Sequence, residues 1–194
     1  RLMSPFSQQS RSITTIDAQQ IQASPARSLA ELLQQEAGVD IRRRGPMGSQ
    51  ADLYIRGGSF DQTLLLIDGI KLEDAQTGHH TLNAALPLEL IERIEIIKGP
   101  AARVYGQNAF TGAINIVTKT NFDDAMELRL SGGSFEQING SLTAYKSLEH
   151  SAHMAHVSRY TSRGYRYNTD YDQSNYTLKS VFNKQGRPIN LLAT

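Results

Sequence analysis

The sequence has 194 residues, a net charge of +1 and no cysteine. This length allows one domain and a remainder, or two small domains. The near-neutral charge gives no general attraction to nucleic acid, so we expect no nucleic-acid partner. Without cysteine the chain has no disulfide bond, no thiolate nucleophile and no cysteine-ligated metal site. The longest apolar run, residues 63–67, is far shorter than the roughly 20 residues of a membrane-spanning helix, although a transmembrane β-barrel gives only weak hydropathy signals.

The first part of the chain opens with a polar lead-in and continues into a helical pattern. Residues 1–13 are predicted to be flexible. The sequence opens at Arg1 without a signal-peptide pattern, so a targeting segment, if there was one, is expected to have been removed. Residues 28–35 are predicted to form a helix, because three leucines share one face and Ser28 can cap its first turn. Gly38 is expected to end this helical region.

Short strands and turn signals follow the helix. Asp68-Gly69 predicts a tight turn directly after the apolar run, since glycine tolerates a positive φ. Pro87 favours a short helix over residues 87–91. Strands are predicted at residues 39–41, 53–55, 63–67, 93–97 and 113–119. Together these elements predict a compact α+β domain over residues 14–120.

The pattern changes near residue 121, where apolar and polar residues begin to alternate. Such alternation predicts antiparallel strands at residues 126–131, 138–145, 152–160 and 176–182. The first link between these strands is short, whereas residues 162–175 form a long polar link. Short turns at one end and long loops at the other are typical of outer-membrane barrels. Six of the eight tyrosines lie between Tyr145 and Tyr176, which fits an aromatic girdle at a membrane interface.

Four sequence blocks stand in order between residues 28 and 119. They are SLAELLQQEAGVDIRRRG, ADLYIRGGSFDQTLLLIDGIKL, LELIERIEIIKGPAARVYGQNAF and TGAINIVTK. In order and spacing they resemble the plug domain of TonB-dependent outer-membrane receptors. The strands over residues 121–194 stand where that family begins its barrel. The loop QTGHH and the link GGSFEQ resemble the cobalamin-transporting branch most closely.

The resemblance implies energy-coupled import of a scarce nutrient across the outer membrane of a Gram-negative bacterium. The plug would lie in the lumen of a transmembrane β-barrel of about 22 strands, whose outer surface contacts membrane lipid. TonB would pull on a segment upstream of this sequence, and some members also use a surface lipoprotein to capture substrate. Four strands cannot close a barrel in lipid, so a longer parent chain is expected.

Two arginines match family positions that face acidic residues of the barrel wall. They are Arg56 in IRGG and Arg93 in IERIEII. A planar guanidinium suits bidentate pairing with carboxylates, so the resemblance implies that these two residues hold the plug in the barrel. Without the family blocks, each would be interpreted as an exposed surface arginine.

The transported ligand is expected to meet the two plug loops that point outward in the family. One is the loop at residues 45–50, and the other spans residues 74–83. The predicted ligand-binding residues are Met47, Gly48, Ser49, Gln50, Gln76, Thr77, Gly78, His79 and His80. Adjacent histidines seldom converge on one metal ion without further ligands, so hydrogen bonding to a large ligand is the favoured role of His79 and His80.

Two further groups of residues contain side chains of the kinds that bind metal ions. Asp170 and Asp172 lie in a polar loop with oxygen side chains at alternate positions, and cobalamin transporters carry an acidic calcium loop at about this point of the barrel. We therefore predict calcium at Asp170 and Asp172, although the EF-hand glycine and distal glutamate are absent. His153 and His156 would face opposite sides of a strand, so a shared metal is not expected there.

Several alternatives stay open from the sequence. Cobalamin or a related corrinoid is the first choice of ligand, followed by a siderophore, haem or another metal chelate, because family members share most of the blocks. A soluble binding module with a plug-like fold and a secreted enzyme are the competing classes. The sequence contains no catalytic triad or nucleophile motif, and Ser59 and Ser134 each follow two glycines in turn-forming contexts. We therefore predict no catalytic residue and no enzyme.

Overall fold

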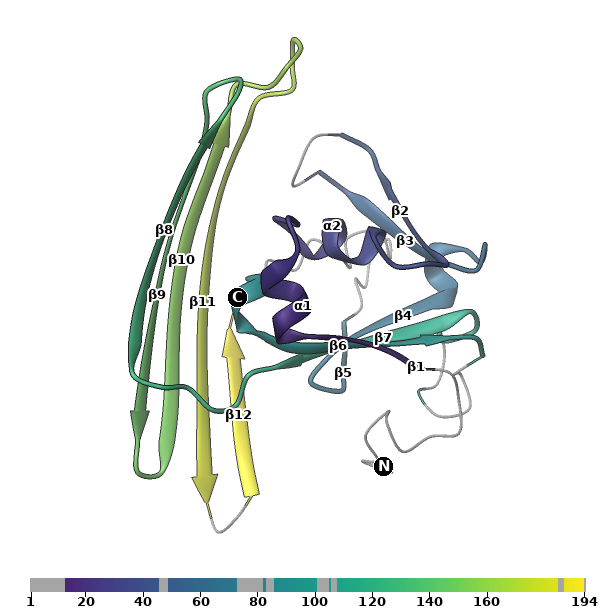
Figure 1. Ribbon diagram of the computed structural model, residues 1–194. Coiled ribbons are helices and arrows are strands. Elements are labelled where there is room, and N and C mark those ends of the chain that lie inside the picture. The colour runs from purple at the N-terminus through teal and green to yellow at the C-terminus, as the bar shows by residue number, and fades with distance from the viewer. Residues whose placement is uncertain are drawn as a thin grey trace. The chain divides into compact units, whose positions relative to one another are not determined.

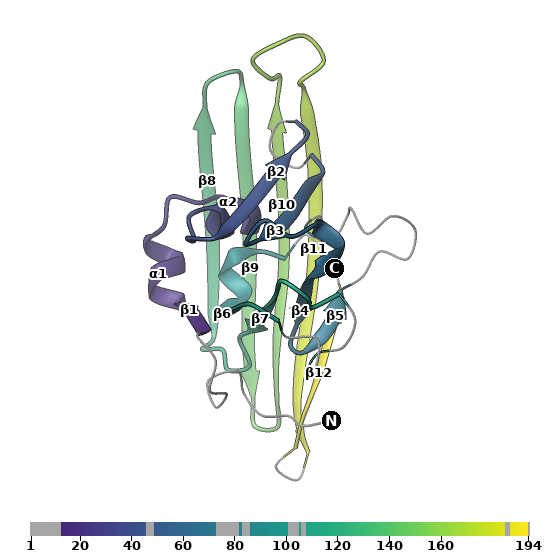
Figure 2. The same cartoon turned by 90° about the vertical axis from the view of Figure 1, so that its right-hand side faces the viewer.

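The computed structural model describes residues 13–45, 49–72, 82, 86–100, 105, 108–184 and 187–193. The chain forms two compact units. All of the first unit precedes Lys119, and the second unit contains all residues from Lys119 onward. In the described residues each unit contains a five-stranded sheet, and a two-stranded sheet completes the first unit. Figures 1 and 2 show the two larger sheets from directions a quarter-turn apart.

The main sheet of the first unit is mixed, with the strand order β1-β6-β7-β4-β5. Strands β4 and β7 run parallel to each other, and the other neighbouring pairs are antiparallel. The strands are β1 (Ile13–Asp17), β4 (Thr63–Ile67), β5 (Ile70–Leu72), β6 (Ile91–Lys98) and β7 (Gly112–Thr118). The smaller sheet is a hairpin of β2 (Val39–Arg43) and β3 (Ala51–Ile55).

Short capped helices connect these strands. Helix α1 (Ala18–Ala23) begins with a capping box. Asp17 Oδ1 accepts from the Gln20 backbone amide at 2.8 Å, and Gln20 Oε1 accepts from the Asp17 backbone amide at 2.9 Å. Helix α2 (Leu29–Gln34) is capped by Ser28, as predicted, through a 3.2 Å bond from the Glu31 amide. Single 3-10 turns lie at η2 (Phe60–Gln62) and η4 (Leu88–Leu90). None of the helices that the structure describes has the length and apolarity needed to cross a bilayer.

The central strands of the mixed sheet are buried on both faces. Consecutive side chains of a strand point to opposite faces, and the three consecutive leucines of β4, residues 64–66, are each at most 2% exposed. On one face, Leu64 and Leu66 pack in a cluster with Ile97, Ala109 and Ala113. The continuous apolar run at residues 63–67 therefore forms the doubly buried strand that the sequence predicts.

The Asp68-Gly69 turn joins β4 to β5 and is tied to the neighbouring strand β7. Both residues have positive φ, 49° and 77°, which is the geometry of a two-residue hairpin turn. Asp68 Oδ1 accepts from the Thr118 amide at 2.8 Å, and the Gly69 amide donates to Asn115 Oδ1 at 3.0 Å. The predicted turn is confirmed, and its side-chain bonds attach it to a strand that lies about 50 residues further along the chain.

The second unit is an antiparallel sheet in which consecutive strands are neighbours. Its strands are β8 (Ala125–Gly133), β9 (Gln137–Leu148), β10 (Ser151–Ser162), β11 (Tyr171–Lys184) and β12 (Arg187–Ala193). Residues 149–150 link β9 to β10 at one end. At the other end residues 134–136 link β8 to β9, and residues 163–170 link β10 to β11. We call this second end the loop end of the sheet; it is the upper end in Figure 1.

The two faces of this sheet differ in polarity. One cross-strand row pairs Leu128, Leu142, Val157 and Tyr176. The adjacent row, whose side chains point to the opposite face, pairs Glu127, Thr143, His156 and Thr177. Exposed large hydrophobic residues continue the first face on all five strands: Met126, Leu128, Leu130, Ile138, Leu148, Val157, Tyr176, Leu178, Phe182, Ile189 and Leu191. We call the first the apolar face and the second the polar face. This alternation is typical of membrane strands that are lipid-facing on one side.

The structure corrects three predicted details. Residues 13–17, for which no strand was predicted, pair with β6 as β1, and of these only Ile13 belongs to the predicted flexible lead-in. The second unit has a fifth strand, β12, in addition to the four predicted, because a strand that starts at Arg187-Pro188 carries no clear alternating pattern. Strand β11 begins at Tyr171 and not at Tyr176, so the long link covers residues 163–170. Its polar first residues resemble a loop but pair with β10.

Candidate functional site

The hairpin β2–β3 carries the first of the two predicted ligand loops. At the base of this loop the Arg44 amide donates to the Gln50 carbonyl at 3.0 Å. The buried carboxylate of Asp52 accepts from Arg44 Nη2 at 3.2 Å and from Gln50 Nε2 at 3.3 Å. Asp52 therefore fixes both ends of the loop, a role that the sequence analysis did not assign. Of the predicted ligand residues here, Ser49 and Gln50 are described, whereas Met47 and Gly48 lie outside the described residues.

The three consecutive arginines before this loop are paired with carboxylates. Arg42 Nε donates to Asp40 Oδ2 at 2.9 Å, and this hydrogen bond raises the pKa of Arg42. The Arg42 guanidinium carbon lies 4.4 Å from the centre of the Tyr54 ring. Arg43 Nη1 lies 3.3 Å from Glu31 Oε1, and Arg44 pairs with Asp52. Each of the three guanidiniums therefore has a carboxylate partner in the same unit.

The second predicted ligand loop follows β5. Its predicted residues Gln76, Thr77, Gly78, His79 and His80 all lie outside the described residues. The three-residue pairing of β5 with β4 positions the chain just before this loop, and within the loop Leu82 is described and buried. Ligand binding by this loop stays a prediction.

Arg56 directly follows β3 and is exposed. It has a positive φ of 51°, and its amide donates to the Gly38 carbonyl at 3.0 Å. A methyl group built on Gly99 would lie 3.6 Å from Arg56 Nη1, so the side chain extends over that glycine. Among the residues that the structure describes, no carboxylate pairs with Arg56.

Arg93, by contrast, has partners within its own unit. Its Nε donates to Glu95 Oε1 at 2.8 Å, and its Nη1 lies 3.1 Å from Glu92 Oε1. Glu95 is 3% exposed, and its second oxygen accepts from Asn115 Nδ2 at 3.0 Å. The side-chain oxygen Oδ1 of Asn115 in turn accepts from the Gly69 amide. We call the chain Arg93–Glu95–Asn115–Gly69 the plug polar network.

The sequence alone indicates one contact of this network, the pairing of Arg93 with Glu95. Arg93 and Glu95 are two residues apart in a strand, so their side chains lie on the same face. The partner Asn115 lies opposite Glu95 in the register of β6 and β7, which no local pattern indicates. The predicted pairing of Arg93 with the barrel wall is neither shown nor contradicted by these contacts.

The predicted calcium ligands Asp170 and Asp172 do not form a cluster in this structure. Asp172 lies on β11, where its two oxygens accept from Arg159 Nε at 3.2 Å and Arg159 Nη2 at 2.8 Å. Within the described ranges, no group of three or more histidine, cysteine, aspartate or glutamate residues could hold a metal ion. Calcium binding at Asp170 and Asp172 stays a prediction.

The histidines of β10 also do not share a site. His153 lies 2.9 Å from both Ser151 and Ser180, whereas His156 Nδ1 lies 2.8 Å from Thr143 Oγ1. The two rings point to opposite faces of the sheet, as the strand spacing predicts.

The sequence model of the TonB-dependent receptor plug domain matches residues 5–113, which is more than half of the chain. The chain belongs to the TonB-dependent receptor plug family. The predicted family and fold class, an α+β plug followed by antiparallel strands, are thus confirmed. This family consists of transport receptors and not of a class of enzymes.

Among curated relatives of this plug-family chain, the vitamin B12 transporter BtuB of Vibrio vulnificus is 35% identical over 148 residues. That alignment covers 76% of this chain and 24% of the relative. The vitamin B12 transporter BtuB of Vibrio cholerae is 41% identical over 107 residues, covering 55% of this chain and 17% of the relative. The chain therefore spans about a quarter or less of the length of these relatives.

Solved structures of other receptors share the fold. The pyoverdine outer-membrane receptor FpvA of Pseudomonas aeruginosa superimposes with a TM-score of 0.76 over 94% of this chain and 27% of the receptor, at 17% identity. The ferric-catecholate import receptor Fiu of E. coli gives a TM-score of 0.69 over 90% of this chain and 25% of the receptor, at 24% identity. At these identities the likeness concerns the fold alone.

Proposed function

We propose that the chain is the plug and first barrel strands of a TonB-dependent outer-membrane transporter that imports cobalamin or a related corrinoid. The observation that carries the choice of ligand is the 35–41% identity to vitamin B12 transporters. The longer of these alignments covers 148 residues and so exceeds the segment matched by the plug family. The likeness thus includes residues outside the family's common plug.

The sheet of the second unit supports the membrane part of this proposal. Its apolar face exposes large hydrophobic side chains on five consecutive strands, for example Leu130 at 75% and Met126 at 72%. A contiguous apolar surface of this extent is unfavourable in water and marks a membrane or protein contact. A soluble binding module with a plug-like fold would not be expected to expose such an apolar surface to water.

In this proposal TonB pulls on a segment upstream of the plug, and the plug moves to open a path through the barrel. The exposed guanidinium of Arg56 is the better candidate to bind an acidic residue of the barrel wall, since Arg93 already contacts Glu92 and Glu95. The contact is electrostatic and reversible, so it can hold the plug at rest and release it under force. Residues at 45–50 and 74–83 would contact the ligand.

A second candidate ligand is a ferric siderophore or another metal chelate, including haem. The receptors FpvA and Fiu, named for pyoverdine and ferric catecholate, share the fold. Their low identity makes this choice weaker than a corrinoid.

The experiment that tests the function is a binding titration of cyanocobalamin against the full-length protein in detergent, with and without calcium. A ferric catecholate and a ferric hydroxamate are titrated in parallel. We expect tight cyanocobalamin binding that weakens at least tenfold in the double variant His79→Ala/His80→Ala, the effect of losing about 1.4 kcal/mol of contacts.

The matched control is His150→Ala, an exposed histidine in the two-residue link between β9 and β10. It should leave the affinity unchanged. Binding of a ferric chelate in place of cyanocobalamin would retain the transporter proposal and replace its ligand. Absence of binding by every probe would overturn the transport proposal.

A further inference from the structure

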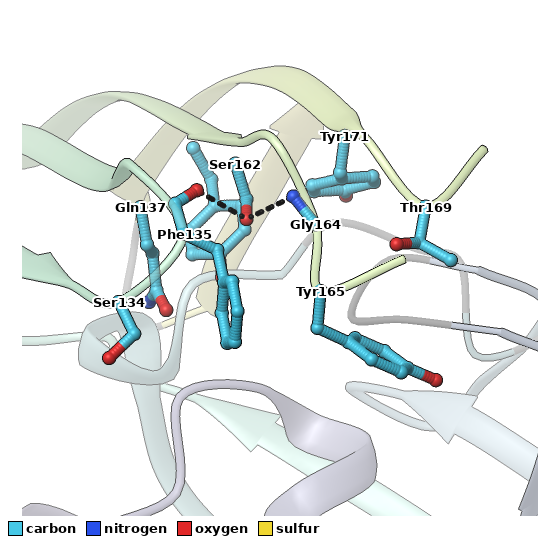
Figure 3. Close-up of a pocket in the computed structure, with 9 residues that line it drawn as sticks. Ser134, Phe135, Gln137, Ser162, Gly164, Tyr165, Thr169 and Tyr171 are labelled. Atoms are coloured by element: carbon cyan, nitrogen blue, oxygen red, sulfur yellow. Dashed lines mark hydrogen bonds between the residues drawn. The ribbon is translucent and has the colours of Figure 1, made fainter. Parts of the chain in front are cut away.

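A pocket of about 160 Å³ lies at the loop end of the second sheet. None of its lining residues was predicted to belong to a site, although the predicted calcium ligand Asp170 lies between two of them, Thr169 and Tyr171. Four aromatic side chains line it, contributed by the β8–β9 turn, β10, the β10–β11 loop and β11: Phe135, Tyr160, Tyr165 and Tyr171. Ser134 and Gln137 add polar groups to the lining. Figure 3 shows the pocket with these segments around it.

The aromatic side chains form two pairs. The Phe135 and Tyr165 rings are arranged edge to face, with their centroids 6.4 Å apart. The Tyr160 and Tyr171 rings are tilted, with centroids 5.4 Å apart. Both separations lie in the range in which aromatic rings attract each other, about 4.5–7 Å. A further planar ring entering the pocket would meet ring faces and edges in the same favourable geometries.

The walls of the pocket are held in place without a ligand. The Arg163 amide donates to the Phe135 carbonyl at 3.0 Å, and Arg163 Nε lies 2.8 Å from Glu136 Oε2. The Ser162 hydroxyl bridges the Phe135 carbonyl at 3.5 Å and the Gly164 amide at 3.1 Å, as the dashed lines in Figure 3 mark. These contacts join the β8–β9 turn to the β10–β11 loop. A preformed site binds with less loss of conformational entropy.

The long loop itself is closed around Thr169. Its hydroxyl accepts from the Arg166 amide at 3.0 Å and donates to the Arg166 carbonyl at 2.7 Å. Gly164 has a φ of +75°, and a Cβ there would lie 2.2 Å from the Thr169 carbonyl oxygen. Glycine is therefore required at this position for the loop to keep its shape.

Two of the aromatic residues remain largely exposed despite these contacts, Phe135 at 57% and Tyr165 at 60%. The Arg166 guanidinium carbon lies 5.2 Å from the centre of the Tyr165 ring. Exposed aromatic side chains around a preformed hollow gain free energy when a ligand covers them. The hollow is partly open to solvent, and its volume is on the order of 150 Å³, the size of an enclosed cavity that accepts benzene.

We propose that this pocket binds one planar ring that carries a hydroxyl group, such as the phenolic ring of a ligand that approaches the loop end of the sheet. The ring size follows from the volume, the planarity from the two aromatic pairs, and the hydroxyl group from Gln137 and Ser134 in the lining. The proposal does not depend on which nutrient the protein transports.

The test uses the full-length protein in detergent and measures saturation-transfer NMR titrations with phenol and with cyclohexanol. Cyclohexanol has the same ring size and hydroxyl group but is not planar. We expect phenol to bind at least about fivefold more tightly than cyclohexanol, the effect of one aromatic contact. Tyr165→Ala should weaken phenol binding by a similar factor.

Tyr167→Ala is the matched control, because Tyr167 belongs to the same loop, is 93% exposed and does not line the pocket. It should leave phenol binding unchanged, and Tyr165→Phe should retain most of it. Equal loss in Tyr165→Ala and Tyr167→Ala, equal affinity for phenol and cyclohexanol, or no saturation transfer to phenol would each overturn the proposal. Cyanocobalamin binding measured on the same sample reports separately on the transport proposal.

Discussion

At the scale of single residues, Glu95 determines how the polar groups inside the plug are arranged. Its side chain is almost completely buried, and its two oxygens bind different partners, Arg93 and Asn115. A buried carboxylate is tolerated only when it is paired and hydrogen-bonded. The plug polar network meets this requirement and at the same time connects β6, β7 and the turn after β4.

We expect Glu95→Ala to destabilise the plug by about 2–3 kcal/mol, because it leaves Arg93 and Asn115 without their shared acceptor. Glu95→Gln keeps one acceptor and should cost about 1 kcal/mol. The measurement is amide hydrogen exchange of β6 and β7 in the full-length protein. The control is Glu92→Ala, which removes the other carboxylate partner of Arg93. Because Glu92 is half exposed, this substitution should lower the stability of the plug by less than about 1 kcal/mol. Unchanged exchange in Glu95→Ala would contradict this role.

At the scale of elements, the β10–β11 loop has a shape that its strands do not impose. It depends on Gly164, on the Thr169 hydroxyl and on contacts with the β8–β9 turn. The turn residues Phe135 and Glu136 have positive φ values of 61° and 53°. Such backbone conformations are unfavourable for residues other than glycine and persist where surrounding contacts hold them.

We expect Gly164→Ala to change the loop without unfolding the sheet. The added methyl group would overlap the Thr169 carbonyl, so the loop must move and the aromatic pocket must open. Phenol binding should fall by at least about fivefold, as for loss of a ring contact. Gly140→Ala is the matched control within the same sheet, since its nearest contact, a Leu130 methyl, is at an ordinary 3.4 Å. A Gly164→Ala protein with unchanged phenol affinity would refute the requirement for glycine.

At the scale of the whole molecule, the apolar face indicates how the strands would cross a membrane in the proposed transporter. On β8 the exposed hydrophobic residues 126–130 are level with residues 155–159 of β10, whereas on β12 Ile189 and Leu191 are level with residues 151–153. From centre to centre, a drift of about five residues, or about 17 Å, over four strand spacings of about 4.8 Å corresponds to a tilt of about 40°. Transmembrane barrel strands tilt by about 35–45°.

We expect a charge on the apolar face to destabilise the membrane-embedded protein far more than a charge on the polar face. Leu128→Arg should cost about 2–4 kcal/mol, the penalty for arginine near the middle of a bilayer. Ser131→Arg lies on the same strand with its side chain on the polar face and should change stability by less than about 1 kcal/mol. Urea unfolding of the full-length protein in lipid vesicles provides the comparison. Equal destabilisation by both substitutions would contradict the assignment of the two faces.

Local patterns in the sequence were sufficient for much of the fold. Strand β4 has the predicted bounds, Ser28 caps helix α2, and Asp68-Gly69 forms the predicted turn. Alternation identified four of the five described strands of the second sheet. These features depend on residues close together in the chain, whose side-chain periodicity and turn chemistry are readable without the rest of the molecule.

The order of the family blocks placed the chain among TonB-dependent receptors, and the alternation after residue 121 indicated membrane strands. The partners of Arg93, the anchoring of the ligand loop by Asp52 and the aromatic pocket were decided only by the tertiary structure. Each depends on which residues lie opposite one another in neighbouring strands, or on how two loops meet. Strand register is set by the packing of a whole sheet, so one residue of slippage would change every one of these contacts while leaving the local pattern the same.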